Sequence, residues 1–279
     1  MSRFHILTSG HENPSPIRLR PITFGDVVAA LTEGWADFLQ KPSHYGFVVL
    51  LYPVIGLALF FWVSRGNAMQ LIYPLISGFA LLGPVAAIGL YEISRRLERH
   101  EEASWRHAFA VLHSPALPAI LAVGLALLLW FILWVYVAGL IYALTFDGQA
   151  HEDLRSLIRD VLSTPEGRTL MVIGNLVGFL FAVVTLCTTV VTFPLLLDRD
   201  VGAITAVKTS IRAVWQNPAA LLGWGLVIAV LLGLGALPGL AGLIIVLPVL
   251  GHATWHIYRK LVVGSGPPAS RGTPPVRDR

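Results

Sequence analysis

Five long runs of apolar residues limit what this chain can fold into. The bilayer core holds no water to pair with backbone amides, so a run of about 20 apolar residues that crosses it must be a helix. The last run is too long for one crossing and is broken by a Gly/Pro-rich stretch, GLGALPGLAG, at Gly233–Gly242. The sequence therefore predicts an all-α, polytopic membrane protein with six transmembrane helices. The five runs are residues 46–64, 69–92, 117–144, 169–197 and 219–261.

The composition fits a membrane protein. Only 13% of the 279 residues are charged and the mean hydropathy is +0.71, whereas about a quarter of a soluble domain is charged. The single cysteine, Cys187, allows neither an intramolecular disulfide nor a thiolate metal site within one chain. Residues 1–21 lack an apolar signal-peptide core, so we expect a flexible tail and insertion driven by the first span. We expect residues 264–279, rich in Pro, Gly and Arg, to be disordered.

The positive charges are distributed unevenly around the predicted spans. Six spans place the N-terminal segment, the 2–3 loop, the 4–5 loop and the C-terminal segment on one side, with 16 of the 20 Lys and Arg residues. The positive-inside rule then places both termini in the cytoplasm. This orientation accounts for the sequence pI of about 9.5, so we expect no nucleic-acid partner.

A short pattern recurs three times before a proline, ending at Pro42, Pro115 and Pro218. The residues three and four positions before each proline are apolar. In the first and third copies, apolar residues also stand 7, 11 and 14 positions before the proline, which is one stripe of an α-helix. The opposite face carries acidic residues in the first copy and Lys208 and Arg212 in the third. We expect three cytoplasmic amphipathic helices, whose apolar faces lie either in the lipid headgroup region or against the protein's own helix ends.

The second helix of each hairpin repeats as well. GPVAAIGLYEISRRL and LPVLGHATWHIYRKL share Pro84/Pro248 and an aromatic and basic boundary, and the middle copy keeps Pro194. Aromatic and basic residues are typical where a helix leaves the cytoplasmic leaflet. The repeats predict one domain, 22–263, made of three units of surface helix plus transmembrane hairpin, at about 22–97, 101–200 and 201–263.

Three of these stretches resemble a known family. YPLISGFALLGPVAAIGLYEISRRLE, LLLDRDVGAITAVKTSIRAVWQNP and LPVLGHATWHIYRKLV are similar to the signature stretches of an uncharacterised family of bacterial integral membrane proteins, domain of unknown function 2189. The likeness covers about residues 20–263. It implies six helices in the bacterial cytoplasmic (inner) membrane and no assigned activity.

His252 and His256 are the first candidate site. They stand four residues apart on one helix face, the spacing that lets two imidazoles share a metal, and an axial haem ligand is also conceivable. Other cytoplasmic histidines would have to complete such a site through tertiary contacts. The alternative is that the pair only interacts with the end of its helix, where histidines bond the last carbonyls.

Four further polar positions have functional and structural interpretations. Glu92 is an ionisable group at a membrane edge, and ion pairing with Arg95 or Arg96 is the structural interpretation. Glu92 aligns with His256 in the repeat, so the two would meet if the repeats pack around one axis. Asp198, Arg199 and Asp200 follow the fourth span. Asp200 is expected to cap a helix beginning near Ala203, and the alternative is a proton or cation relay that includes Asp198.

One sizeable feature is predicted on the outer side. In His151–Gly167, Leu154, Leu157, Ile158, Val161 and Leu162 form one apolar stripe, which predicts a small external surface helix. It is the best place for an extracytoplasmic partner.

The sequence shows no phosphate loop, nucleophile elbow or paired catalytic carboxylates. We therefore expect a non-enzymatic protein without a cofactor that scaffolds membrane components or organises lipid through its surface helices. Its partners would be membrane lipids and other membrane proteins. The alternative is a transporter of a lipid or another largely apolar small molecule, because no charged residue lies at the centre of a span. A third possibility is a metal or haem protein that uses His252 and His256.

Overall fold

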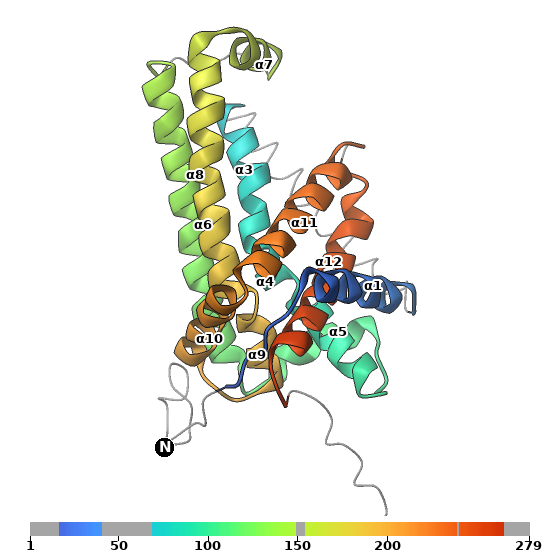
Figure 1. Ribbon diagram of the computed structural model, residues 1–279. Helices are drawn as coiled ribbons and strands as arrows, with labels where there is room; N and C mark the ends of the chain where they lie inside the picture. Colours follow the sequence, from blue (N-terminus) through green and yellow to red (C-terminus); the bar gives the residue numbers. More distant parts are fainter. Residues whose placement is uncertain (1–16, 41–68, 149–153, 239, 265–279) are drawn as a thin grey trace, which may run out of the picture.

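The computed structural model describes residues 17–40, 69–148, 154–238 and 240–264, and these ranges hold helices and turns but no strand (Figure 1). The predicted first span, 46–64, lies outside the described residues, as do residues 1–16 and 265–279. The N-terminal tail was predicted to be flexible through residue 21. Instead, Ile17 is buried and Leu19 pairs with Val262 in an isolated antiparallel bridge, because the apolar residues here pack beside the end of the last helix.

The elements follow one another as α-helices and short 3-10 helices. In chain order they are α1 (Phe24–Gln40), η2 (Met69–Leu71), α3 (Ile72–Phe79), η3 (Ala80–Leu82), α4 (Gly83–Ala86), α5 (Ile88–Glu98), η4 (Trp105–His113), α6 (Leu117–Thr145), α7 (Leu154–Ser163), α8 (Pro165–Thr189), α9 (Thr192–Asp198), α10 (Ala203–Gln216), α11 (Pro218–Ala236) and α12 (Leu243–Leu261).

Within the described residues, four helical segments are long and apolar enough to cross a membrane. They are Ile72–Glu98, Leu117–Thr145, Pro165–Asp198 and Pro218–Ala236. The predicted break at Gly233–Gly242 is confirmed, since α11 ends at Ala236 and α12 begins at Leu243. The sixth predicted span, α12, is a helix but is not among the four. Its C-terminal half carries two histidines, Arg259 and Lys260, and is largely buried within the protein.

Proline decides where several helices start and break. Pro165 and Pro218 each occupy the first turn of a helix, where a missing N–H costs nothing, and the Thr164 hydroxyl caps α8 by accepting from Gly167 N at 3.0 Å. Pro84 and Pro194 cannot donate to the carbonyls of Ala80 and Val190. The 3-10 turn η3 therefore precedes Pro84, and the helix is interrupted between α8 and α9 just before Pro194.

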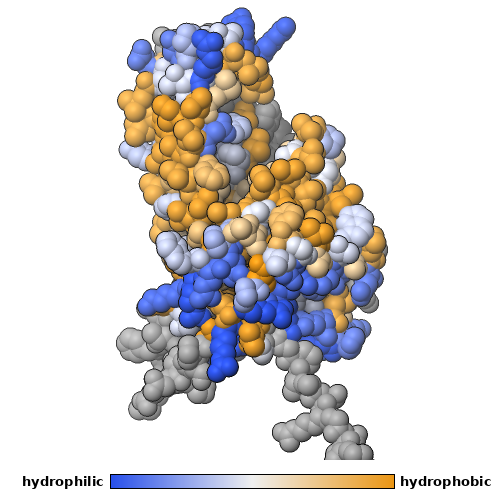
Figure 2. Space-filling view, viewed as in Figure 1, coloured by the Kyte–Doolittle hydropathy of each residue, from blue (hydrophilic) through white to orange (hydrophobic). Residues whose placement is uncertain are grey.

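The helices form an apolar body between two polar ends. Figure 1 shows α6 and α8 side by side, with α7 at one end and α9 and α10 at the other. Figure 2 shows an apolar band between hydrophilic surfaces at the two ends. In an apolar 18-residue window of each candidate span, only 11–22% of the residues are buried inside the protein, so the others are at least partly exposed to the surrounding medium. This pattern fits lipid rather than water around the band.

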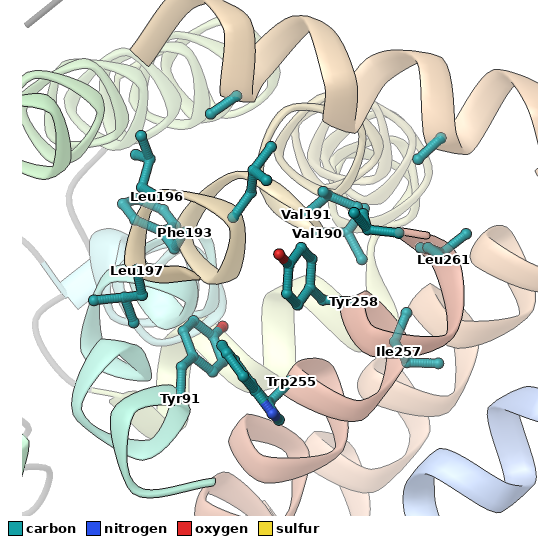
Figure 3. Close-up of a cluster of buried hydrophobic side chains, with 14 of the residues drawn as sticks. Tyr91, Val190, Val191, Phe193, Leu196, Leu197, Trp255, Ile257, Tyr258 and Leu261 are labelled. Atoms are coloured by element: carbon teal, nitrogen blue, oxygen red, sulfur yellow. The ribbon is translucent and has the colours of Figure 1, made fainter. Parts of the chain in front are cut away.

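The largest buried core lies toward the end that holds α9 and α10. Phe193 and Leu196 of α9 pack with Trp255 and Tyr258 of α12 (Figure 3), and all four are at most 2% exposed. The Trp255 and Tyr258 rings are 5.4 Å apart and tilted by 49°. We call this end, made of α1, α5, η4, α9, α10 and the C-terminal half of α12, the polar base.

Three short elements of the polar base cover the ends of the longer helices. α1 packs on α12, η4 on α5, and α10 on α8 and α9. η4 is a 3-10 helix, whereas the sequence predicted an α-helix. Its large apolar residues Phe109 and Leu112 stand three apart, the spacing that a 3-10 helix aligns on one face.

Candidate functional site

The crossing of α1 over α12 depends on a glycine. A Cβ on Gly34 would lie 2.5 Å from the backbone nitrogen of Ala253 and 2.8 Å from its Cα. The two backbones therefore approach more closely than any side chain at position 34 permits. This close approach brings the polar face of α1 against α12 and α5.

Six side chains from three helices meet where α1 crosses α12. They are Glu33 and Asp37 of α1, Ser94 of α5, and His252, His256 and Lys260 of α12; we call them the seam cluster. Ser94 and His252 are 0% exposed and Asp37 is 8% exposed. Buried polar groups of this kind are costly unless they are hydrogen-bonded.

The inner part of the seam cluster is a chain of short contacts. The Ser94 hydroxyl donates to Asp37 Oδ2 at 2.6 Å, and Ser94 Oγ lies 2.8 Å from His252 Nδ1. A serine hydroxyl has one proton. Because that proton goes to Asp37, His252 Nδ1 carries its own proton and donates to Ser94.

The outer part of the seam cluster is built around His256. Its Nε2 lies 2.8 Å from Asp37 Oδ2, and its Nδ1 lies 3.3 Å from Glu33 Oε2. Lys260 Nζ reaches the other Glu33 oxygen at 2.8 Å. The histidine therefore stands between two carboxylates of α1, one of which also binds a lysine of α12.

The predicted pairing of Glu92 is confirmed. Glu92 is 2% exposed, and its carboxylate binds Arg95 Nη2 at 2.7 Å and Arg96 Nε at 2.8 Å, so both candidate partners are used. Arg95 also donates to the Leu197 carbonyl at 3.2 Å, which ties α5 to α9. Glu92 and His256 align in the repeat, but the structure gives them different partners.

The charged residues after the fourth span, Asp198, Arg199 and Asp200, agree only in part with what the sequence predicted. Asp198 accepts a hydrogen bond from the Tyr258 hydroxyl at 2.6 Å, and Arg99 lies 3.5 Å from its other oxygen. Arg199 Nη2 donates to the Val263 carbonyl at 3.0 Å. The predicted cap by Asp200 is wrong. α10 does begin at Ala203, but its N-cap is Gly202 with φ of 71°, a conformation that suits glycine.

Sequence reasoning missed three participants in these networks. Glu98 of α5 accepts from Arg259 Nε at 2.9 Å and from Trp255 Nε1 at 3.2 Å. Ser94 and Lys260 were likewise not singled out. Glu33 and Asp37 were noticed only as the polar face of a helix. Glu33 and Asp37 stand one helical turn apart, opposite an apolar stripe, and His252 and His256 have the same spacing. This equal spacing is the sequence feature that could have indicated the contact between the two pairs.

The histidine pair was also considered as a metal or haem site. In the part of the chain that the structure describes, no group of three or more His, Cys, Asp or Glu side chains is arranged to hold a metal ion. His252 instead contacts Ser94, and His256 contacts Asp37 and Glu33. In this arrangement the two histidines take part in hydrogen bonds and charge pairing that join α1, α5 and α12.

Comparison with known proteins gives one match. No curated protein and no solved structure matches the chain. A family model described as "Predicted integral membrane protein (DUF2189)" matches residues 72–198, which include the first resembling stretch and part of the second. The third stretch, which contains both histidines, lies beyond the match. The predicted resemblance is confirmed over this segment: residues 72–198 are similar to the DUF2189 family of predicted integral membrane proteins.

Proposed function

We propose that this chain is a non-enzymatic protein of the bacterial inner membrane that organises lipid in the cytoplasmic leaflet and scaffolds other membrane components there. In this proposal the polar base faces the cytoplasm. The elements α1, η4 and α10 lie in the headgroup region, one of the two placements that the sequence leaves open.

The observation that carries the proposal is the inverted character of α1. Its charged residues Glu33 and Asp37 face the protein, in contact with α12 and α5. Val27 of α1 packs into the core, but four other large apolar residues face outward: Phe24 (54% exposed), Val28 (51%), Trp35 (45%) and Leu39 (58%). A surface helix in water shows the reverse arrangement. An apolar medium beside α1 removes this conflict, as for helices that lie in a membrane interface.

The other two surface elements support the same interpretation. α10 exposes Ile204, Ile211 and Trp215, and Trp215 is 85% exposed. η4 exposes Phe109 and Leu112. Tryptophan is enriched where protein meets the membrane–water interface.

The packing of the surface elements also supports three related units. α1 opens the first unit but packs on α12 of the third, η4 packs on α5 of the first, and α10 packs on α8 and α9 of the second. Each surface element thus covers the second helix of another unit, and the three contacts form a closed ring. Such a ring would present apolar faces in several directions within one leaflet.

The experiment measures the lipid that the protein immobilises. Wild type and the double variant Val28→Ser/Leu39→Ser are reconstituted in vesicles that contain spin-labelled phosphatidylglycerol or phosphatidylcholine. The motionally restricted lipid per protein is then read from the spectra. We expect more restricted phosphatidylglycerol than phosphatidylcholine for wild type, because anionic headgroups attract the basic cytoplasmic side. We expect the double variant to immobilise less of both.

Ala36→Ser is the matched control. Ala36 is exposed on α1 but stands away from the apolar stripe, so this change should leave the restricted lipid unaltered. Equal lipid restriction by wild type and the double variant would contradict the proposal.

A further inference from the structure

His256 has a carboxylate oxygen beside each ring nitrogen. Nε2 faces Asp37 at 2.8 Å and Nδ1 faces Glu33 at 3.3 Å. A neutral imidazole carries a proton on only one nitrogen, and the other nitrogen presents a lone pair. A lone pair directed at a carboxylate oxygen is repulsive. Both contacts are attractive only when the group of one ring and two carboxyls holds one proton more than a neutral ring and two carboxylates.

The charges of the seam cluster lead to the same result. Glu33 and Asp37 together contribute two negative charges and Lys260 contributes one positive charge. With a neutral His256, a negative charge is left over in a region where the side chains of Asp37 and His256 are only 10% and 16% exposed. An extra proton makes the seam cluster neutral. Uncompensated charge at a partly buried site is strongly disfavoured.

The neighbouring charged groups do not supply this missing positive charge. On α5, Glu92 is held by Arg95 and Arg96, and Glu98 is held by Arg259 of α12. In the segment before α1, the Arg20 guanidinium donates to the backbone carbonyl of Lys260. Within the described residues, the charges of α5 are ion-paired with other groups, and the Arg20 guanidinium contacts backbone carbonyls and neither Glu33 nor Asp37, so the proton is the cation that completes the seam cluster.

We propose that the seam cluster is a proton-binding site, in which one proton shared by His256, Asp37 and Glu33 fastens α1 to α12. Ser94 and His252 extend the site inward, because Ser94 donates to the same Asp37 oxygen that faces His256. Losing the proton as the pH rises turns one attractive contact into a repulsive one. Attachment of α1 is therefore strongest on the acid side and weakens as the pH increases.

This proposal depends on the contacts between α1 and α12 and not on lipid binding by the outer face of α1. The Val28→Ser/Leu39→Ser variant leaves the seam cluster intact. The two proposals can therefore fail separately.

The test measures hydrogen exchange of α1 in the full-length protein in mild detergent. Mass spectrometry follows the peptides of residues 24–40 between about pH 5 and about pH 8, the interval in which histidines change charge, with rates corrected for intrinsic exchange. We expect protection of α1 in wild type to fall by about tenfold or more as the pH rises, the size of effect typical of losing a charge-assisted hydrogen bond. The variants His256→Gln and Glu33→Gln should retain a protected α1 with much less pH dependence.

His113→Gln is the matched control, because His113 is an exposed histidine on η4. This variant should behave as wild type. Protection of α1 that does not change with pH in wild type, or that changes equally in His256→Gln, would overturn the proposal.

A second measurement keeps the proposal testable if α1 exchanges too slowly to follow. In protein labelled with 15N-histidine, the His256 signals are identified by their loss in His256→Gln. Under the conditions in which α1 is protected, we expect protons on both ring nitrogens, because each nitrogen then faces a carboxylate oxygen. A ring with a proton on only one nitrogen under those conditions would refute the proposal.

Discussion

Gly34 and Asp37 stand three residues apart on α1, and each position tolerates little change for a different reason. Gly34 lets two backbones approach, and Asp37 accepts hydrogen bonds from Ser94 and His256. Replacing Gly34 by alanine has two opposite effects on stability. Alanine improves helix propensity by about 1 kcal/mol, but overpacking against a backbone costs about 1–3 kcal/mol. We expect net destabilisation, because the added Cβ would lie 2.5 Å from the backbone nitrogen of Ala253, which cannot rotate away as a side chain can.

The first prediction compares two glycine-to-alanine changes on the same helix. Gly34→Ala should lower the thermal unfolding midpoint in detergent and deprotect residues 24–40 in hydrogen exchange. Gly25→Ala should be neutral or slightly stabilising, because its Cβ would meet only the Thr23 hydroxyl at an ordinary 3.4 Å. If the two variants unfold at the same temperature, the close crossing of α1 and α12 is not where the structure places it.

At the residue scale, the sequence predicted local partners better than distant ones. The Glu92 ion pairs join residues three and four apart on one helix, so helical geometry alone was enough to find them. The contact between His256 and Asp37 joins residues 219 positions apart. No spacing rule reaches across that separation, because it depends on how α1 packs on α12.

The start of α1 shows how one element is stabilised by its own sequence. Thr23 N and Oγ1 both donate to Asp26 Oδ2 at 2.8 Å, and Asp26 N returns a longer bond to the hydroxyl. The backbone hydrogen bond first, and then the hydroxyl bond, hold the pKa of Asp26 below its ordinary value of 3.8. A lowered carboxyl pKa stabilises the folded helix above that ordinary value. This stabilisation is lost as the pH falls through the lower folded value.

The second prediction concerns this cap. Thr23→Ala should destabilise α1 by about 1 kcal/mol, the usual cost of losing an N-cap residue. It should also weaken the loss of α1 stability at acid pH. The control Thr32→Ala removes a hydroxyl that bonds only to the Val28 carbonyl within the helix, and its effect should be within about 0.5 kcal/mol. Hydrogen exchange of residues 24–40 measures both, and equal effects of the two variants would count against the cap.

The positions of Gly and Pro predicted where helices begin and end. They did not always predict whether a helix is an α-helix or a 3-10 helix. The break between α11 and α12 and the start of α10 followed from the sequence. The 3-10 geometry of η4 did not, since its pattern of apolar residues suits both helix types over nine residues. The length of α12 was enough for a sixth span, but its charged and buried C-terminal half belongs to the polar base.

The whole molecule has an apolar band with a polar surface at each end, and the two ends differ. α7 stands at one end, while α1, α9 and α10 gather at the other (Figure 1). The distribution of Lys and Arg predicts that the polar base faces the cytoplasm. This orientation is a prediction that accessibility measurements in cells can check.

The third prediction therefore places single cysteines at the two ends, in a Cys187→Ala background. A membrane-impermeant maleimide should label Ser163→Cys, on α7, in cells whose outer barrier alone has been opened. It should label Gln216→Cys, at the end of α10, only after the inner membrane is also permeabilised. Both side chains are exposed in the structure, so burial would not explain a difference. The reverse pattern would show that the assigned orientation is wrong.

Spin-label depth measurements show whether the outward face of α1 lies in lipid, as we propose. Nitroxides are attached to Val28→Cys and, separately, to Ala36→Cys, in Cys187→Ala protein reconstituted in liposomes. These positions are on the same helix and both are exposed in the structure, but only Val28 belongs to the apolar stripe. We expect the label at position 28 to collide mainly with oxygen, which dissolves in the bilayer, and the label at position 36 to collide mainly with a water-soluble nickel complex. Equal access of the nickel complex to both labels would place α1 in water and contradict the proposed function.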